Sequence, residues 1–367
     1  MTSMEHVLIS PDDEAGVVAL AACASHIFPK ALKAAIELDI FEIVGRAHGD
    51  GLSPSEIASQ LPTGNVDRTV VVLDSLLRLL VTRSLLTCSI CKLANGSIER
   101  RYGLALAGRF FVGDENGGSL VPYFDYVSRD EPMQQISFKD AVLEGGNIFE
   151  KPHGKSYYGS LASDPESGRI FDNAMGAHST MLMKKVVKIY NGFEGLSSLV
   201  NVGGGNGATL DSIVSNFPSI RAINFDLQHV VQIAPSYIGM EHIGGDMFLE
   251  VPKGEAILLK FVLHNWGDEQ CTKLLNNCYK ALPNKGKVIV MECIMPNSPQ
   301  TDHIHATYVS QQDIVMAILS QGKERTEDEF KAMAMGAGFA EFKVVCCVYG
   351  IWIMEFYKLV QPNQIIG

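Results

Sequence analysis

The sequence predicts a two-part protein, in which a mostly helical N-terminal domain precedes an α/β domain built on a doubly wound sheet. Three observations support this fold class. The 367 residues are enough for two hydrophobic cores. The pattern from Ala15 to about Phe111 is helical and then hairpin-like. From about residue 194 onward, short apolar runs alternate with helix-sized segments, as expected for a mostly parallel sheet covered on both faces.

Residues 1–117 are expected to form a winged-helix domain. The stretch GVVALAACASHIFPKALKAAIELDIFEIV is apolar on too many sides for one chain to cover, which suggests contact with a second copy. Ser53, followed by Pro54 and Glu56, begins a further helix with the spacing of a capping box. Two strand-like runs, LLTCSI and RRYGLAL, follow an amphipathic helix and are separated by an Asn-Gly turn signal. We expect this shape to mediate homodimerisation rather than DNA binding.

Residues 118–367 are expected to hold the α/β domain, beginning with a helical connector over about 118–193. The runs that predict its main strands are SLVNV, AINFD, AILLKFVLH and KVIVMECI. Near the end, FKVVCCVY and IWIMEFYK lie only a few residues apart. That spacing predicts a hairpin that completes the sheet in the antiparallel direction.

The composition argues against several classes of function. The chain carries a formal net charge of -11, whereas nucleic-acid affinity depends mostly on Lys and Arg that neutralise phosphates. No run of about eighteen apolar residues occurs, and the first residues lack the basic and apolar regions of a signal peptide. The eight cysteines are scattered without zinc spacing, which favours reduced thiols. We therefore expect a cytoplasmic protein that acts on a small molecule, without a nucleic-acid or membrane partner.

A glycine-rich turn follows the first strand of the expected sheet. Gly203, Gly205 and Ala208 in VGGGNGA match the fingerprint G-x-G-x-x-G/A, in which glycines let a ligand approach the start of a helix. The same pattern also serves plain tight turns, because glycine tolerates unusual dihedral angles. Asp226 ends the next strand, where a carboxylate accepts hydrogen bonds from the ribose hydroxyls of either NAD or S-adenosylmethionine.

The segment GGDMF separates these two cofactors. It places Asp246 and Met247 after the third strand, where an adenine amino group and ring face are held. The compact glycine turn also suits a zwitterionic amino-acid tail better than a pyrophosphate, which prefers helix-terminal amides without nearby negative charge. The combination favours S-adenosylmethionine, because a nicotinamide oxidoreductase fits only the glycine turn.

Seven motifs, in order, resemble the plant caffeic acid O-methyltransferase family: LVNVGGGNG, AINFDLQHVV, GGDMF, LLKFVLHNWGDEQC, GKVIVMEC, GKERTEDEF and IMEFYK. The likeness covers nearly the whole chain. It implies a Rossmann-like methyltransferase domain behind a dimerising winged-helix domain, with S-adenosyl-L-methionine as methyl donor and no metal. The positions that match the family's cofactor contacts, beside Gly205 of the fingerprint, are Ser179, Gly203, Asp226, Asp246, Met247 and Lys260. The sequence departs at Asn201, where the family usually has an acid before the glycines.

The run KFVLHNW ends an apolar strand in a histidine. His264 lies at the C-terminal end of that strand, where ligands of open α/β sheets bind, although a lone histidine more often caps the following helix. By resemblance, His264 matches the family's catalytic base, and Glu292 and Glu324 match the acids that flank it. A phenol has a pKa of about 10, so it needs a base such as imidazole, with an unperturbed pKa of about 6.5. A carboxylate at one ring nitrogen fixes the tautomer and leaves the other nitrogen free to take the acceptor's proton.

Asn265 departs from the family, which usually has Asp after this histidine. An amide can hydrogen-bond but carries no charge, so a group that stabilises imidazolium is missing. A weaker base matters less for an arylamine, whose lone pair attacks before its proton leaves, and some relatives methylate anthranilate. The sequence therefore predicts O-methylation of a small phenolic, with N-methylation of an aromatic amine as the near alternative. A non-catalytic binding paralogue is a second alternative, which Asn201 and Asn265 suggest and the retained His264 opposes.

Three further positions match the family's aromatic acceptor pocket: Phe171, Met175 and Met316. We expect these side chains, with Asn265, to contact the small aromatic substrate, although Met and Phe more often belong to a plain core. Two segments differ from the family pattern, residues 126–137 and residues 318–321. They line the acceptor end, so the exact acceptor and its regiochemistry do not follow from the sequence.

Overall fold

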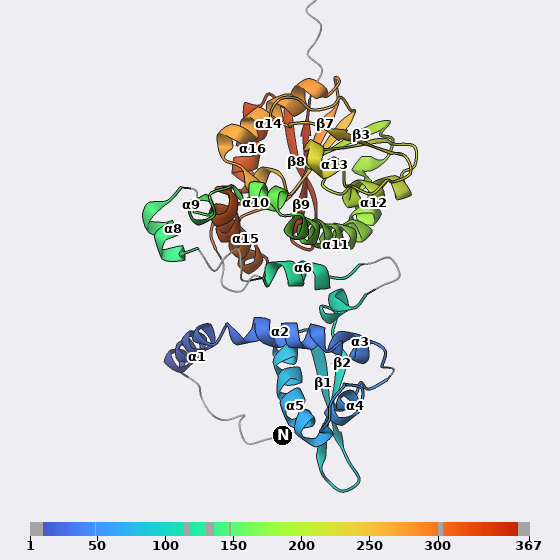
Figure 1. Ribbon diagram of the computed structural model, residues 1–367, viewed down its shortest axis with the longest axis vertical. Helices are drawn as coiled ribbons and strands as arrows, with labels where there is room; N and C mark the ends of the chain where they lie inside the picture. Colours follow the sequence, from blue (N-terminus) through green and yellow to red (C-terminus); the bar gives the residue numbers. More distant parts are fainter. Residues whose placement is uncertain are drawn as a thin grey trace, which may run out of the picture. The chain divides into compact units, whose positions relative to one another are not determined.

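The computed structural model describes residues 10–47, 49–113, 118–129, 136–146, 148–299 and 304–358. The chain divides into two compact units, residues 1–128 and 129–367 (Figure 1). The boundary expected after residue 117 precedes one short helix that belongs to the first unit. The first unit is mainly helical and the second is an α/β domain, so the predicted fold class is confirmed.

The first unit consists of helices followed by a two-stranded hairpin and two short helical segments. Its elements are α1 (Pro11–Cys23), α2 (Ile27–Glu37), α3 (Ile40–Gly45), α4 (Pro54–Ala58), α5 (Val66–Thr82), β1 (Leu86–Lys92), β2 (Ile98–Leu104), the 3-10 helix η1 (Gly108–Phe111) and α6 (Val121–Val127). Strands β1 and β2 pair in the antiparallel direction. Gly96, with a φ of 83°, lies in the turn between them, so the expected hairpin is confirmed.

Local signals explain where helices of this unit begin and break. The Ser53 hydroxyl accepts from the amide of Glu56 while the Glu56 carboxylate accepts from the amide of Ser53, which confirms the capping box of α4. The long apolar segment after Ala15 is not one helix. It breaks after α1 and again at Asp39, whose φ of 52° lies in the left-handed region.

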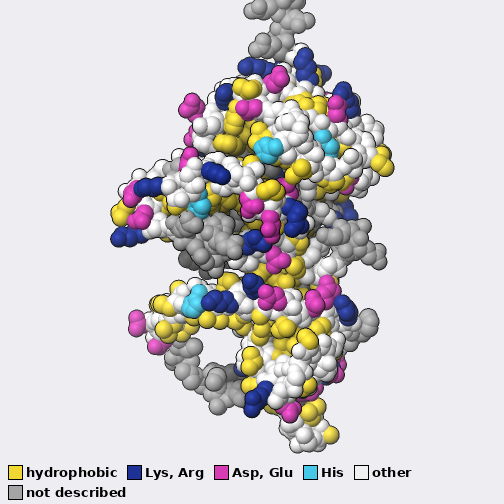
Figure 2. Space-filling view, viewed as in Figure 1, with side chains coloured by type: hydrophobic (Ala, Val, Ile, Leu, Met, Phe, Trp, Pro, Cys, Tyr) yellow, Lys and Arg dark blue, Asp and Glu magenta, His cyan; other side chains and the backbone are white. Residues whose placement is uncertain are grey.

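Helix α1 leaves its apolar side chains uncovered. It has no buried residue, and Val17, Val18 and Leu20 are 64%, 70% and 72% exposed. Figure 2 shows hydrophobic side chains gathered along α1 and α2. Val71 and Val72 of α5 are exposed as well. This uncovered apolar surface is what the sequence led us to expect of helices that contact a second chain.

No helix among the described residues is long and apolar enough to span a membrane by itself. Helices α1 and α2 reach that length and composition only as a pair, and the chain bends by 56° between them.

The second unit begins with helices and continues as alternating strands and helices. Its helices are α8 (Phe138–Glu144), α9 (Glu150–His153), α10 (Tyr157–Ser163), α11 (Pro165–Ile189), η2 (Asn191–Phe193), α12 (Ala208–Asn216), α13 (Gln228–Val231), η3 (Leu263–Asn265), α14 (Asp268–Ala281), α15 (Ile304–Ser320) and α16 (Glu327–Gly336). Its strands are β3 (Ser198–Val202), β4 (Arg221–Asp226), β5 (Met240–Gly244), β6 (Ala256–Lys260), β7 (Lys287–Cys293), β8 (Glu341–Val348) and β9 (Ile351–Tyr357). The helical connector and the strands expected from the apolar runs are thus confirmed.

The seven strands form one sheet in the order β5-β4-β3-β6-β7-β9-β8. Strands β3 to β7 are parallel, whereas β9 runs antiparallel to both β7 and β8, which confirms the predicted final hairpin. The chain moves from β3 to β4 on one side and later returns to β6 on the other, so the strand order reverses at β3. In open α/β sheets a ligand binds outside the carboxyl ends of the strands at such a switch point.

Helices cover both faces of the sheet. Leu274 of α14 and Phe330 of α16 belong to the core on one face, and Leu182 of α11 and Ile213 of α12 belong to the core on the other. Because both faces are buried, the central strands are mostly apolar. The packing brings the carboxyl ends of five parallel strands to one edge, where the candidate site lies.

Candidate active site

The turn after β3 is open on the side where a ligand would lie. Gly203 and Gly205 have φ values of 66° and 55°, in the left-handed region that favours glycine. A Cβ on Gly203 would come within 2.9 Å of Val262, and one on Gly204 within 2.0 Å of the Asn224 side chain. A Cβ on Gly205 would meet no described atom within 4 Å. The turn therefore needs glycine for shape and packing, and at Gly205 it leaves space.

Asp226, at the end of β4, closes one side of this turn. Its Oδ2 accepts from the amide of Gly205 at 2.8 Å, and its Oδ1 accepts from the amide of Leu227 at 2.7 Å. Burial raises the pKa of Asp226, although these two amides oppose the shift. Each carboxylate oxygen keeps a further lone pair, so the residue can still accept from another donor such as a hydroxyl.

The residues after β5 are held by backbone and side-chain hydrogen bonds. Asp246 Oδ1 accepts from the amide of Phe248 at 2.8 Å. Asn277 Nδ2 donates to the carbonyl of Met247 at 3.0 Å, which ties this loop to α14. Both Asp246 and Met247 are half-buried at the same edge of the sheet as Asp226.

Asn201, where the family usually has an acid, is buried beneath the glycine turn. Its Nδ2 donates to Asn224 Oδ1 at 3.4 Å, and Asn224 Nδ2 donates to the carbonyl of Gly205 at 2.9 Å. In the described part of the chain, Asn201 Oδ1 has no hydrogen-bond partner. The two amides support the turn from the core side, while Gly205 faces outward.

The chain leaves β6 through a strained residue. Phe261 has a φ of 53°, which costs about 1–3 kcal/mol for a residue other than glycine and persists only where its surroundings enforce it. Glu292 Oε1 supplies part of that support, because it accepts from the amides of Val262, Leu263 and His264 at 2.9, 2.8 and 3.4 Å. One buried carboxylate thus holds the start of η3.

His264, Glu292 and Glu324 meet in a buried cluster. Nδ1 of His264 lies 2.8 Å from Glu324 Oε1 and 3.7 Å from Glu292 Oε2. Since an ionised carboxylate only accepts, Nδ1 carries the proton and Nε2 is the nitrogen left free. Among the described residues, Nε2 has no hydrogen-bond partner.

Burial and charge oppose each other at His264. Burial lowers the pKa of this imidazole, but Glu292 and Glu324 raise it, and the net pKa lies above its usual value of 6.5. Burial raises the pKa of Glu292, although His264 opposes the shift. Glu292 Oε2 and Glu324 Oε2 are buried without a hydrogen-bond partner in the described residues. The two carboxylates therefore favour the protonated, positively charged form of the imidazole.

Donor atoms of these three residues lie within 4.8 Å of one another, a spacing that metal sites also use. Three of these side-chain atoms, Glu292 Oε1, Glu324 Oε1 and His264 Nδ1, are engaged by hydrogen bonds. Glu292 Oε1 accepts from three amides, and Nδ1 of His264 is bonded to Glu324. The carboxylates of Glu292 and Glu324 therefore hold both the backbone and the ring of His264.

Asn265 directs its amide to the backbone. Its Nδ2 donates to the carbonyl of Phe261 at 2.9 Å, and the residue is 8% exposed. An ionised carboxylate at this position cannot donate that hydrogen bond. The contact between Asn265 and substrate that the sequence suggested stays a prediction.

Of the two other expected cofactor residues, Ser179 is buried and Lys260 is half-buried. Ser179 of α11 donates its hydroxyl to the carbonyl of Met175 at 2.7 Å. Lys260 ends β6, and its Nζ lies 4.6 Å from the centroid of the Phe261 ring. Burial lowers the pKa of Lys260 to about 8, and the charge of Glu292 limits the fall.

Aromatic side chains of α10 and α11 gather near η3. The ring centroid of Phe171 lies 6.2 Å from that of Tyr158, which stacks on Trp266 at 6.5 Å and 20°. Met175 lies one turn further along α11, and Met316 lies in α15, both half-buried. Residues 130–135 of one segment that departs from the family lie outside the described residues. Sequence reasoning missed Tyr158, because a tyrosine pair in a helical connector carries no site signal.

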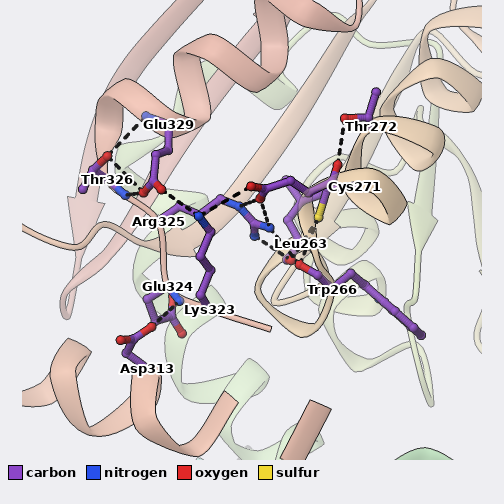
Figure 3. Close-up of polar contacts among 11 residues, drawn as sticks. Leu263, Trp266, Cys271, Thr272, Asp313, Lys323, Glu324, Arg325, Thr326 and Glu329 are labelled. Carbon is purple, nitrogen blue, oxygen red and sulfur yellow. Dashed lines mark hydrogen bonds and ion pairs between the residues drawn. The ribbon is translucent and has the colours of Figure 1, made fainter. Parts of the chain in front are cut away.

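Arg325 is the other residue that sequence reasoning missed. It is fully buried between Glu324 and a capping box that Thr326 and Glu329 form at the start of α16. Figure 3 shows its guanidinium directed at the backbone of Leu263 and Trp266. A charged residue within GKERTEDE resembles an exposed one, so only the fold reveals the burial.

Comparisons with known proteins show the family of this chain. The family model for the O-methyltransferase domain matches residues 136–340, and the model for the O-methyltransferase dimerisation domain matches residues 20–114. Caffeic acid 3-O-methyltransferases from Clarkia breweri and Prunus dulcis are 47% and 48% identical to this chain, over 95% of it and 95% of each relative. The crystal structure of human N-acetylserotonin methyltransferase in complex with SAM shares the fold. It has a TM-score of 0.74 at 20% identity, and the match covers 98% of this chain and 100% of that chain.

The sheet, the glycine turn and these matches define an S-adenosylmethionine-dependent O-methyltransferase. Within that class, the chain belongs to the plant caffeic acid O-methyltransferase family. The resemblance carried by the seven motifs is thereby confirmed. The dimerisation domain precedes the methyltransferase domain, as the sequence led us to expect.

Proposed function

We propose that this protein methylates a hydroxyl of a small plant phenolic compound, with His264 as the general base. One observation carries this proposal. The imidazole is buried at the carboxyl edge of the sheet, and Glu324 Oε1 at 2.8 Å from Nδ1 leaves Nε2 as the nitrogen that can accept a proton. A hydroxyl brought to Nε2 loses its proton there while its oxygen attacks the methyl group.

The methyl donor fits the residues around the glycine turn. Gly205 faces open space at a strand-to-helix turn, and Asp226 beside it keeps free lone pairs for hydroxyl groups. The residues that would hold S-adenosylmethionine are Ser179, Gly203, Gly205, Asp226, Asp246, Met247 and Lys260. The bound donor would supply a methyl group on a positively charged sulfonium.

The two glutamates have different roles in this proposal. Glu324 holds Nδ1–H, so the ring keeps one orientation and one tautomer. Glu292 holds the amides of η3 and adds negative charge 3.7 Å from Nδ1. Both carboxylates stabilise the imidazolium that forms when Nε2 takes the proton. Catalysis then depends on the geometry and charge of the chain's own side chains.

The acceptor class follows from the relatives and from the aromatic side chains near η3. The relatives named above are caffeic acid 3-O-methyltransferases, and caffeic acid is a phenol. Tyr158, Phe171 and Trp266 offer flat apolar faces that suit an aromatic ring. An anthranilate-type amine has a similar shape, so N-methylation is the outcome to be tested against O-methylation.

We also propose that the protein acts as a cytoplasmic homodimer. The match to a dimerisation domain over residues 20–114 and the uncovered apolar side chains of α1 support the dimer. All eight cysteines are free, which fits a reducing compartment.

The decisive experiment replaces the base and follows both substrates. His264→Ala should abolish turnover of phenols while the affinity for S-adenosylhomocysteine, measured by calorimetry, stays within about threefold, because the ring does not support the glycine turn. Labelled donor with a mixed panel of phenols and anthranilates should place the label on oxygen. Turnover by His264→Ala at the wild-type rate, or label on nitrogen alone, would refute the proposal.

A further inference from the structure

Arg325 binds the backbone on both sides of His264. Its Nη1 donates to the carbonyl of Leu263 at 2.9 Å, and its Nη2 donates to the carbonyl of Trp266 at 2.8 Å (Figure 3). These carbonyls belong to the short turn η3 and its end, where no regular helix continues to satisfy them. Cys271 Sγ also lies 3.2 and 3.4 Å from the same two oxygens. The guanidinium therefore fixes Leu263 and Trp266, the residues immediately before and after the His264–Asn265 pair.

The buried guanidinium of Arg325 forms an ion pair with a carboxylate at the protein surface, that of Asp268. Arg325 is 0% exposed, whereas the side chain of Asp268, at the start of α14, is 68% exposed. Asp268 Oδ1 accepts from Nε at 3.1 Å and from Nη2 at 2.8 Å, and these bonds lower the pKa of Asp268. A buried cation is stable only when it is paired and its donors are used, and both conditions hold here.

The same stretch of chain carries the acid that orients the imidazole. Glu324 directly precedes Arg325, and its amide donates to Asp313 Oδ1 at 2.8 Å. The amide of Lys323 donates to the carbonyl of His264 at 3.0 Å. A Cβ on Gly322 would come within 1.8 Å of that carbonyl, so the two segments lie in direct contact. Residues 322–325 and 263–266 are thus joined at several points.

We propose that Arg325 is a positioning residue that locks residues 263–266 against residues 322–325, so that Glu324 stays on Nδ1 of His264. The inference rests on the proposed role of His264 as base. The described contacts of Arg325 do not include the imidazole of His264. The guanidinium acts through the backbone carbonyls of Leu263 and Trp266.

If Arg325 positions Glu324 in this way, its substitution should change how the reaction rate depends on pH. The charged groups that act on His264 are Glu292 from β7, Glu324 from the segment before α16, and Lys260 from β6. If the segments slip, Glu324 leaves Nδ1, and burial then lowers the pKa of His264 with less opposition. The acid limb of kcat/KM, which reports the base in the free enzyme, should move to lower pH even as the rate falls.

The experiment compares Arg325→Lys with Asp268→Ala in the full-length protein. Lysine keeps the charge but cannot reach two carbonyls and a carboxylate in the planar geometry of guanidinium. We expect Arg325→Lys to lower kcat at least tenfold and to move the acid limb of kcat/KM to lower pH. The affinity for S-adenosylhomocysteine should stay within about twofold. Asp268→Ala, on the exposed side of the pair, should show the same changes with a two- to fivefold loss of kcat.

The matched control is Arg221→Lys, which alters an exposed pair with Glu241 at 3.3 Å and should leave kcat and the pH profile unchanged. A wild-type kcat for Arg325→Lys would overturn the inference. So would a loss of kcat that follows a loss of cofactor affinity while the acid limb stays in place, because that pattern indicates general unfolding. If Arg325→Lys does not fold, an unaltered profile for Asp268→Ala overturns the inference. Activity of His264→Ala, by contrast, would refute the proposed function itself.

Discussion

The side-chain amide of Asn265 donates to the carbonyl of Phe261 over 2.9 Å, and it does so where the chain turns away from β6. Phe261 has a φ of 53°, so the hydrogen bond supports a conformation that is otherwise unfavourable. The relationship explains why an amide suits this position, since an ionised acid has no proton to donate.

We predict that Asn265→Asp destabilises the second unit. A buried carbonyl that loses its donor costs about 1–3 kcal/mol of the free energy of unfolding, which chemical denaturation measures. Asn216→Asp is the matched control, because Asn216 Nδ2 also donates to the carbonyl four residues earlier, Ser212, at 2.9 Å but on the surface. The control should change stability by less than about 0.5 kcal/mol. Equal effects of the two variants would contradict the role assigned to the Phe261 bond.

The same substitution tests an electrostatic expectation. Aspartate adds a negative charge beside the imidazole, which should stabilise imidazolium and raise O-methylation relative to any N-methylation. The ratio of the two products from a mixed phenol and anthranilate panel measures this effect at one pH. An unchanged ratio would mean that the charge of residue 265 does not reach the base.

We predict that Glu292→Gln moves the acid limb of kcat/KM to lower pH. The charge of Glu292 raises the pKa of His264, and glutamine keeps an oxygen for the three amides without that charge. A base must be unprotonated, so rate rises as pH passes the raised pKa. Protonation of His264 also stabilises the folded protein, and this effect depends on pH in the opposite direction to the rate. The stabilisation is present below pH 6.5 and is lost as the pH rises through the raised pKa of His264 in the folded state.

The maximal rate of Glu292→Gln should fall by about tenfold, part of the roughly 10²–10⁴-fold that general base catalysis contributes. Glu341→Gln is the control, because Glu341 pairs with Lys343 at 3.0 Å in a largely exposed position. A profile for Glu292→Gln that coincides with those of the wild type and this control would show that Glu292 does not act on the imidazole.

We predict that Gly205→Ala weakens cofactor binding without unfolding the protein. No described atom lies within 4 Å of a Cβ at Gly205, so the methyl group would occupy the space expected for the ligand. Affinity for S-adenosylhomocysteine should fall at least tenfold by calorimetry. Gly195→Ala carries the same backbone strain, with a φ of 76° and open space around its Cβ, and should bind normally. Strain alone costs about 1–2 kcal/mol in each variant.

We predict that Val17→Asp separates the dimer. Val17 is 64% exposed on a helix without buried residues, so the substitution should leave the folded chain intact and place a charge in the apolar contact. Light scattering coupled to size exclusion should show a shift to half the mass. Ile238→Asp, at a residue that is 98% exposed in the second unit, should not change the mass. A dimer that survives Val17→Asp would place the contact elsewhere.

Periodicity and turn residues predict much of this fold because they act locally. The runs that became β3, β4, β6 and β7 are short and mostly apolar, as expected for a sheet buried on both faces. The capping boxes at Ser53 and Thr326 are signals within four residues. The break at Asp39 was not predicted, because a left-handed residue inside an apolar segment depends on tertiary packing.

The candidate site was predicted in part, for a physical reason. His264, Glu292 and Glu324 follow from family resemblance and meet as expected in one cluster, with 2.8 Å between Nδ1 and Glu324. The backbone contacts of Asn265 and Arg325 were not predicted. Asn265 donates to the carbonyl of Phe261 and Arg325 to that of Leu263, and these groups come together only when the turn η3 forms. Neither position carries a sequence pattern that distinguishes a buried donor from an exposed one.

The insertion of β9 between β7 and β8 has a consequence for synthesis of the enzyme. Strand β7 carries Glu292, and its register with β9 places Glu292 opposite Trp352. A ribosome-bound chain that ends before residue 351 has a β7 with one bare edge, open to wrong partners such as a neighbouring nascent chain. Residues 351–357 therefore cover this edge of β7, and the buried acid gains its lasting neighbours only after that segment has been synthesised.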